Sequence, residues 1–153
     1  MIFAWILFGK PDLTMGLNGM LAGLVGITAN CDRVTQPEAI IIGAVAGLIV
    51  VAAIIALEEL KIDDPVGAFP VHGACGVWGG IATGIFGDIP VDDMTRADFI
   101  FVQVKWSLII CAWAFGTMLA VFAALKAAGN LRVSAEEEMQ GLDQSAHGMP
   151  AYV

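Results

Sequence analysis

Between Ala39 and Leu57 the chain carries no charged residue, and alanine, valine, isoleucine, leucine and two glycines fill the whole stretch. A helix of about 20 apolar residues crosses the roughly 30 Å hydrocarbon core of a lipid bilayer. The run therefore predicts a membrane-spanning helix over about residues 38–57. This one feature makes membrane embedding the first expectation for the rest of the chain.

The composition agrees with a membrane protein. The 153 residues are 58% hydrophobic and 14% charged, with a mean hydropathy of +0.81, whereas about a quarter of an average soluble chain is charged. The net charge of −8 gives no support for nucleic-acid binding, which needs a basic face. We expect an all-α, polytopic membrane helix bundle, and the length allows one compact unit of a few spans.

Four membrane-spanning helices are predicted, at about residues 12–29, 38–57, 65–86 and 99–125. Polar segments separate them, and the chain turns polar again after Lys126. The expected organisation is therefore a transmembrane region over residues 1–133 and a polar tail over residues 134–153. In that tail Ser134 and Glu137 have the spacing of a capping box, which predicts a short helix.

Glycines mark faces for close helix packing. On the first predicted span they recur at steps of three and four, at Gly16, Gly19, Gly23 and Gly26. The second span carries a GxxxG pair at Gly43 and Gly47. Asn18 is a polar residue within the first span and needs a partner there. Pro70 lies inside the third predicted span and should kink or locally open that helix.

The segment from Asp63 to Gly80 begins with two acids and then becomes apolar and glycine-rich around a single histidine, His72. Ionisable residues within spans are rare and mark functional sites by default. A neutral imidazole both donates and accepts hydrogen bonds and exchanges protons near neutral pH. The alternative is a structural histidine that is hydrogen-bonded to a neighbouring helix.

Other site chemistries find no support in the sequence. Cys31, Cys75 and Cys111 lie far apart and form no CxxC or Cys/His cluster, so neither a metal site nor a complete disulfide framework is expected. No nucleophile–base pair or phosphate loop is visible, and we expect no enzyme activity and no cofactor. The run after Met1 lacks the features of a signal peptide and looks like the last turns of a helix whose beginning is absent.

Basic residues near the span ends predict the orientation. One side carries Lys10, Lys61, Lys126 and Arg132, and the other carries Arg33 and Arg96, with Lys105 near the boundary. This bias places the tail in the cytoplasm.

Several short blocks, in order along the chain, resemble the ammonium transporter (Amt/Mep/Rh) family. They are Gly9-Lys10-Pro11, Ala22 to Thr28, Lys61 to Pro65, Val71-His72-Gly73, Trp78-Gly79, and in the tail Leu131 to Ser134, the three glutamates, Gly141-Leu142-Asp143 and His147-Gly148. The resemblance implies a fold of eleven spans, of which this chain is similar to the end of span seven, spans eight to eleven and the cytoplasmic tail. Pro70 departs from it, because glycine or alanine is expected there.

The resemblance also implies the function: ammonium or ammonia transport across the plasma (inner) membrane by a homotrimer, through a hydrophobic, histidine-lined pore. The expected pore residues are His72, Thr28, Val71 and Gly76, although packing is the simpler role for Gly76 and a backbone hydrogen bond for Thr28. Asp63 and Asp64 are expected as a structural anchor at the cytoplasmic end, or as a solvated helix start.

In the tail, the resemblance implies regulatory roles for Arg132, Glu137 and His147 and contact with a PII-type signalling protein. The resemblance also implies that the chain cannot conduct alone, because it supplies only one side of one pore. The alternative function is a stand-alone membrane binding module whose tail recruits a PII-type protein without transport.

Overall fold

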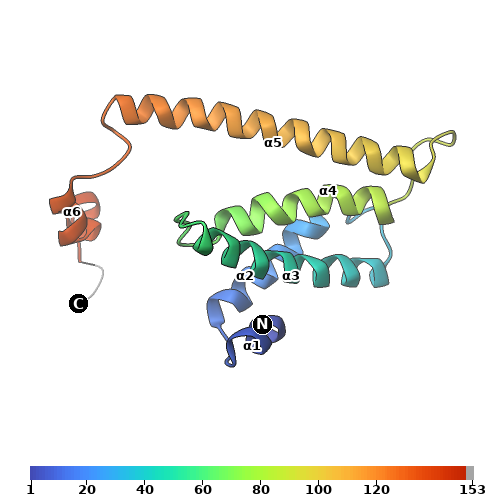
Figure 1. The fold of residues 1–153 in the computed structure, drawn as a ribbon, viewed down its shortest axis with the longest axis horizontal. Helices are drawn as coiled ribbons and strands as arrows, with labels where there is room; N and C mark the ends of the chain where they lie inside the picture. Colours follow the sequence, from blue (N-terminus) through green and yellow to red (C-terminus); the bar gives the residue numbers. More distant parts are fainter. Residues whose placement is uncertain (151–153) are drawn as a thin grey trace. The chain divides into compact units, whose positions relative to one another are not determined.

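The structure, a computed structural model, describes residues 1–150, and every regular element in that range is a helix (Figure 1). The elements are α1 (Ile2–Phe8), α2 (Leu13–Thr28), α3 (Gln36–Glu59), the π-helix η1 (Phe69–Ala74), α4 (Cys75–Phe86), α5 (Arg96–Ala127), α6 (Ala135–Gln140) and α7 (Leu142–His147). The chain divides into a compact unit over Met1–Ile109 and a second unit from Ile110 onward. The expected all-α fold is confirmed.

Each of the four predicted spans coincides with helical structure. By length and composition, α3 and α5 are long and apolar enough to cross a membrane, whereas α2 is a shorter apolar helix. The third span divides into η1 and α4, and its helix begins later than the predicted residue 65. The fourth begins at Arg96, ahead of the predicted residue 99.

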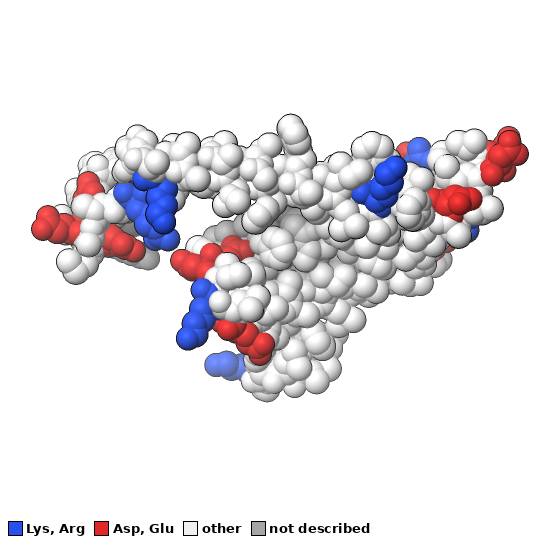
Figure 2. Space-filling view, turned by 45° about the horizontal axis from the view of Figure 1, so that its top comes forward, with Lys and Arg blue, Asp and Glu red and all other residues white. Residues whose placement is uncertain are grey.

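Charged side chains gather toward helix ends and loops, and a wide uncharged surface lies between them (Figure 2). Much of that surface is apolar, because only 22% of the most apolar 18-residue stretch of α3 is buried and none of the corresponding stretch of α5. Large apolar side chains directed outward are what a helix in contact with lipid or with further helices presents.

Side-chain caps fix where α2 and α3 begin. The Asp12 carboxylate accepts a hydrogen bond from the Met15 N–H at 2.9 Å, which makes Asp12 the N-cap of α2. Pro11, which could have opened this helix, lies one residue before the cap. Thr35 and Glu38 form a complete capping box at the start of α3, and such caps satisfy N–H groups that have no partner within the helix.

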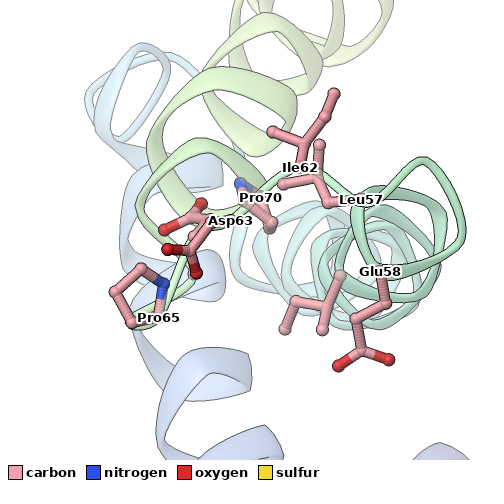
Figure 3. A pocket seen from close by; sticks show the side chains of 9 residues that line it. Leu57, Glu58, Ile62, Asp63, Pro65 and Pro70 are labelled. Atoms are coloured by element: carbon pink, nitrogen blue, oxygen red, sulfur yellow. The ribbon is translucent and has the colours of Figure 1, made fainter.

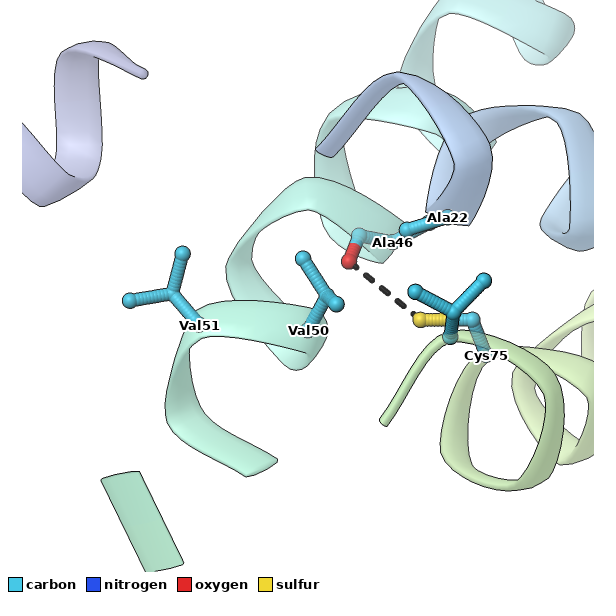
Figure 4. Packing of buried hydrophobic residues seen from close by; sticks show 6 residues of the cluster. Ala22, Ala46, Val50, Val51 and Cys75 are labelled. Carbon is cyan, nitrogen blue, oxygen red and sulfur yellow. Dashed lines mark hydrogen bonds between the residues drawn. The ribbon is translucent and has the colours of Figure 1, made fainter. Parts of the chain in front are cut away.

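The core joins α2, α3 and the η1–α4 helix through small side chains (Figure 4). Its buried members are Ala22, Ala46, Val50, Val51, Val71 and Cys75. The Cys75 thiol donates to the Ala46 carbonyl, with an S···O distance of 3.5 Å. Trp78 packs at the edge of this core, and its indole N–H donates to the Ile42 carbonyl at 3.0 Å.

Helices α2 and α4 are in close backbone contact at Gly26 and Gly79. A Cβ atom on Gly79 would lie 2.8 Å from the Gly26 carbonyl oxygen, so only glycine fits at this contact. The other glycines of the predicted α2 face behave differently: a Cβ on Gly19 or Gly23 would meet no atom within 4 Å. Of the glycine face expected on α2, it is therefore mainly Gly26 that packs against another helix of this chain.

Buried hydrogen bonds fasten the same contact. The Asn30 amide nitrogen donates to the carbonyls of Gly26 and Gly79, at 3.3 and 3.1 Å. The Thr83 hydroxyl donates to the carbonyls of Gly79 and Ala29, at 2.9 and 3.3 Å. Asn30 belongs to the polar segment expected between the first two spans, yet its side chain is fully buried.

Arg96 ties the start of α5 to the end of α4. Its Nη1 donates to the Gly84 and Gly87 carbonyls at 3.1 and 2.5 Å. Carbonyls at a helix C-terminus lack partners within the helix and carry partial negative charge, so a cation is favourable there. A Cβ on Gly84 would lie 2.8 Å from the Ile100 Cα, which makes this a second glycine-dependent crossing.

The Gly26–Gly79 contact predicts a large difference between two glycine substitutions. Gly79→Ala should lower the free energy of unfolding by about 1–3 kcal/mol, the usual cost of overpacking, because backbone atoms cannot yield easily. Gly47→Ala is the matched control, since its Cβ meets nothing within 4 Å. Denaturant titration in detergent micelles measures both, and equal stability of the two variants would contradict the contact.

Candidate functional site

The candidate site is built on the turn that leads into η1. The two carboxylate oxygens of Asp64 accept hydrogen bonds from the Ala68 and Phe69 N–H groups, each at 2.9 Å. The Asp64 carbonyl accepts a third, from the Gly67 N–H at 3.2 Å. Gly67 has a φ of +72°, a left-handed conformation that glycine adopts without strain. Asp64 therefore anchors the helix that carries His72.

Pro70 is accommodated in the first turn of this helix. A first-turn N–H has no acceptor within its own helix, so a residue without an N–H loses nothing there. The helix past Pro70 is wound as a π-helix over Phe69–Ala74. The expected local opening is therefore present, but the helix begins at Phe69, so Pro70 lies in its first turn and not in its interior.

His72 lies within the π turn, and its side chain is exposed. Within residues 1–150 the imidazole makes no hydrogen bond, so the alternative of a histidine bonded to a neighbouring helix has no counterpart there. Its two chain neighbours differ: Val71 is 2% exposed and Gly73 is half-buried. The backbone is thus fixed on one side, and the imidazole is directed away from the core.

The other three predicted pore residues lie in different surroundings. Thr28 donates its hydroxyl hydrogen to the Leu24 carbonyl at 2.6 Å, the backbone bond favoured from the sequence. Val71 packs in the core with Ala46. Gly76 is half-buried, and a Cβ there would make only ordinary contact with Val25, at 3.9 Å. The structure therefore does not gather these residues around His72.

A pocket of about 270 Å³ lies beside the Asp64 turn (Figure 3). It is lined by Ile54, Leu57, Glu58, Ile62, Asp63, Asp64, Pro65, Gly67 and Pro70. Asp63 is exposed and makes no hydrogen bond within the described residues. His72 is not among the lining residues. Asp64 and Pro70 are thus shared between the pocket wall and the base of the His72 helix.

In the tail, the predicted capping box is confirmed. The Ser134 N–H and hydroxyl donate to Glu137 Oε2 at 3.0 and 2.8 Å, and the Glu137 N–H donates back to the hydroxyl at 3.2 Å. The Ser134 hydroxyl, followed by its N–H, holds the pKa of Glu137 below the ordinary value. His147 lies in the last turn of α7, and Arg132 is exposed.

The sequence interpretation missed three polar residues that organise the helices, namely Asn30, Thr83 and Arg96. Only Arg96 carried a usable signal, because a basic residue shortly after a helix end is typical of a cap on its last carbonyls. Asn30 and Thr83 looked like a loop residue and a neutral helix residue. Across residues 1–150 no three His, Cys, Asp or Glu side chains come together as metal ligands.

The model of the Ammonium Transporter Family matches residues 1–152. The chain belongs to the ammonium transporter family. Members of this family are transporters rather than enzymes, and the apolar α3 and α5 fit a membrane protein.

Three relatives show how much of such a protein the chain represents. A putative ammonium transporter of Synechocystis sp. is 49% identical over 148 residues, which cover 95% of this chain and 32% of the relative. Ammonium transporter Amt2 of Archaeoglobus fulgidus is 43% identical over 164 residues, 99% of this chain and 35% of the relative. Ammonium transporter Amt2 of Haloferax mediterranei is 39% identical, with 94% and 32% covered. The chain spans about a third of the length of these curated relatives.

The Asp64 cap predicts that two adjacent acids differ in importance. Asp64→Ala should reduce stability by about 1 kcal/mol, as loss of an N-cap does, and should speed amide exchange at Ala68 and Phe69. Asp63→Ala, which removes a neighbouring carboxylate without a hydrogen bond, should change neither. Hydrogen exchange read by mass spectrometry distinguishes them, and equal protection in both variants would refute the anchor role.

The Glu137 cap predicts a pH dependence confined to acid. Because its pKa is lowered in the folded tail, the cap stabilises α6 fully above the ordinary glutamate pKa of 4.5, and this stabilisation is lost as the pH falls through the lowered value. Ser134→Ala should return the titration midpoint of Glu137 toward its ordinary value. The ¹³C shift of the labelled carboxyl group reports the midpoint, and an unchanged midpoint would contradict the cap.

Proposed function

We propose that the chain forms part of an ammonium transporter that moves ammonium or ammonia across the cell membrane. The observation that carries the proposal is the family match over nearly the whole chain, combined with one ionisable side chain, His72, on an apolar helix outside the core. Neither feature alone would identify a substrate.

The chemistry of His72 suits this substrate. A hydrophobic passage strips water from an ion, and charged forms are disfavoured where water is removed. Ammonium entering such a passage is therefore driven toward ammonia and a proton. An imidazole holds the neutral molecule by accepting or donating a hydrogen bond, or it relays the proton. His72 is the residue to which we assign this role.

Other residues of the chain would support His72. We assign Thr28 and Gly76 to positions along the passage, where Gly76 leaves room because little side-chain bulk intrudes. Val71 would serve the pore as the packed neighbour of His72 that fixes the helix. Asp63 and Asp64 would lie at the cytoplasmic end, where Asp64 holds the helix start.

For the complete protein we propose a homotrimer in the plasma (inner) membrane, with residues 134–153 as a cytoplasmic regulatory tail. Arg132, just before the tail, and Glu137 and His147 within it would contact a PII-type signalling protein. The excess of basic residues on the Lys10, Lys61 and Lys126 side supports this orientation. These 153 residues supply one wall of the passage, so the chain alone should not conduct.

The second candidate is a membrane binding module that recruits a PII-type protein through its tail without transport. The observation in its favour is the capping box at Ser134, which gives a short acidic segment a defined helix start. It predicts that the tail binds its partner while His72 has no effect on any activity.

A chimera tests the transport proposal. Residues 1–150 replace the matching third of the Synechocystis relative, and methylammonium uptake is measured in a cell that lacks its own ammonium transporters. We expect uptake by the chimera and at least a tenfold loss in His72→Ala, because a positioned proton-transfer group typically contributes about 10²–10⁴-fold to a rate.

Cys111→Ala is the control, because Cys111 is exposed on α5 and has no assigned role, so this variant should retain uptake. Full uptake by a well-expressed His72→Ala chimera would overturn the role of His72. Uptake by cells that express only the 153-residue chain would overturn the claim that it cannot conduct alone.

A further inference from the structure

The hydrogen-bond pattern changes within the turn that carries His72. The Val71 N–H donates to the Gly67 carbonyl, four residues back, at 3.1 Å. The Cys75 N–H donates to the Pro70 carbonyl, five residues back. One additional residue is therefore accommodated between Pro70 and Cys75, which is the defining property of a π turn. His72 lies inside this expanded turn.

Both ends of the turn are held in place. At its start, Asp64 accepts hydrogen bonds from the Ala68 and Phe69 N–H groups. At its end, Cys75 is fully buried and its thiol donates to the Ala46 carbonyl. Because neither end is free to slide, a change of winding between them has to appear as rotation of the residues inside the turn.

The size of that rotation follows from helix geometry. Each residue of an α-helix turns the chain by roughly 100°, so a shift of one residue changes which side chain occupies a given face. If the Cys75 N–H bonded the Val71 carbonyl instead of the Pro70 carbonyl, His72 would leave its present face while Cys75 remained buried. The π turn thus determines where the imidazole is directed.

Pro70 is the residue that distinguishes the two windings. It is fully buried, its φ is restricted by the ring, and its carbonyl accepts the Cys75 N–H. An alanine at this position would release the restriction and would let the Cys75 N–H bond the Val71 carbonyl in regular i→i−4 winding. Gly73 contributes too, because a Cβ there would lie 2.6 Å from the Phe69 ring.

We propose that Pro70 is a positioning residue for His72: it keeps the turn between Pro70 and Cys75 in π winding, and this winding directs the imidazole away from the core. That His72 serves transport rests on the proposed function, whereas the effect of Pro70 on the His72 side chain does not.

The experiment uses the 153-residue chain in lipid nanodiscs, with ¹⁵N-labelled histidine and cysteine. The chain has two histidines and three cysteines, so His147 and the amides of Cys31 and Cys111 serve as internal references. Pro70→Ala should shift the His72 imidazole signals and the Cys75 amide signal, and should change the broadening of His72 by a water-soluble paramagnetic probe. The reference signals should stay in place.

Pro65→Ala is the matched control, because Pro65 lies in the same segment but precedes the helix. Pro70→Val keeps most of the volume of the ring, so it separates the release of the backbone from the loss of packing. It takes the place of Pro70→Ala if the alanine variant does not fold. Unchanged His72 and Cys75 signals in a folded Pro70 variant would overturn the proposal, as would equal shifts in Pro65→Ala. Neither result depends on transport, so failure of this proposal would leave the proposed function to be decided by the uptake experiment.

Discussion

The helical unit depends on the close approach of α2 and α4, where Gly79 lies against the Gly26 carbonyl. Dispersion forces fall steeply with distance, so two helices without side chains at their crossing gain contacts that bulkier residues would prevent. The bonds from Asn30 and Thr83 then satisfy carbonyls that the contact leaves buried. The buried Asn30 Oδ1 accepts no hydrogen bond within residues 1–150. The orientation of the Asn30 side chain is set by its amide nitrogen, which donates to the carbonyls of Gly26 and Gly79.

This contact positions the candidate site. Helix α4 continues directly from η1, so the packing of Gly79 and Cys75 determines where the π turn ends. Asp64 determines where it begins. His72 is therefore held by backbone interactions at both sides, and its ring makes no hydrogen bond within residues 1–150. A side chain held in this way keeps its direction while its polar atoms stay free for a ligand.

Much of the helical architecture followed from the sequence because hydrophobic runs of membrane length have few alternatives. The helix over residues 38–57 and the capping box at Ser134 are examples. The boundaries of the third span were less predictable, because nothing local tells a proline within a helix from one in its first turn. The Asp64 cap, six residues before Pro70, decides that question. Asn30 and Thr83 were not predictable either, since their partners lie 49 and 54 residues away in the chain. The family was predictable because its motifs recur in order, whereas the roles of individual residues remain predictions.

The glycines with open space around them affect how this chain will behave once purified. Gly19, Gly23 and Gly43 line a shallow apolar groove between α2 and α3, and a Cβ on any of them would meet nothing. In detergent such a surface promotes association between chains, because another helix fits it as well as a lipid tail does. Self-association of the isolated polypeptide would therefore reflect contacts between copies at this groove. A particle mass of three copies would therefore not count as evidence for the homotrimer that we propose for the complete protein.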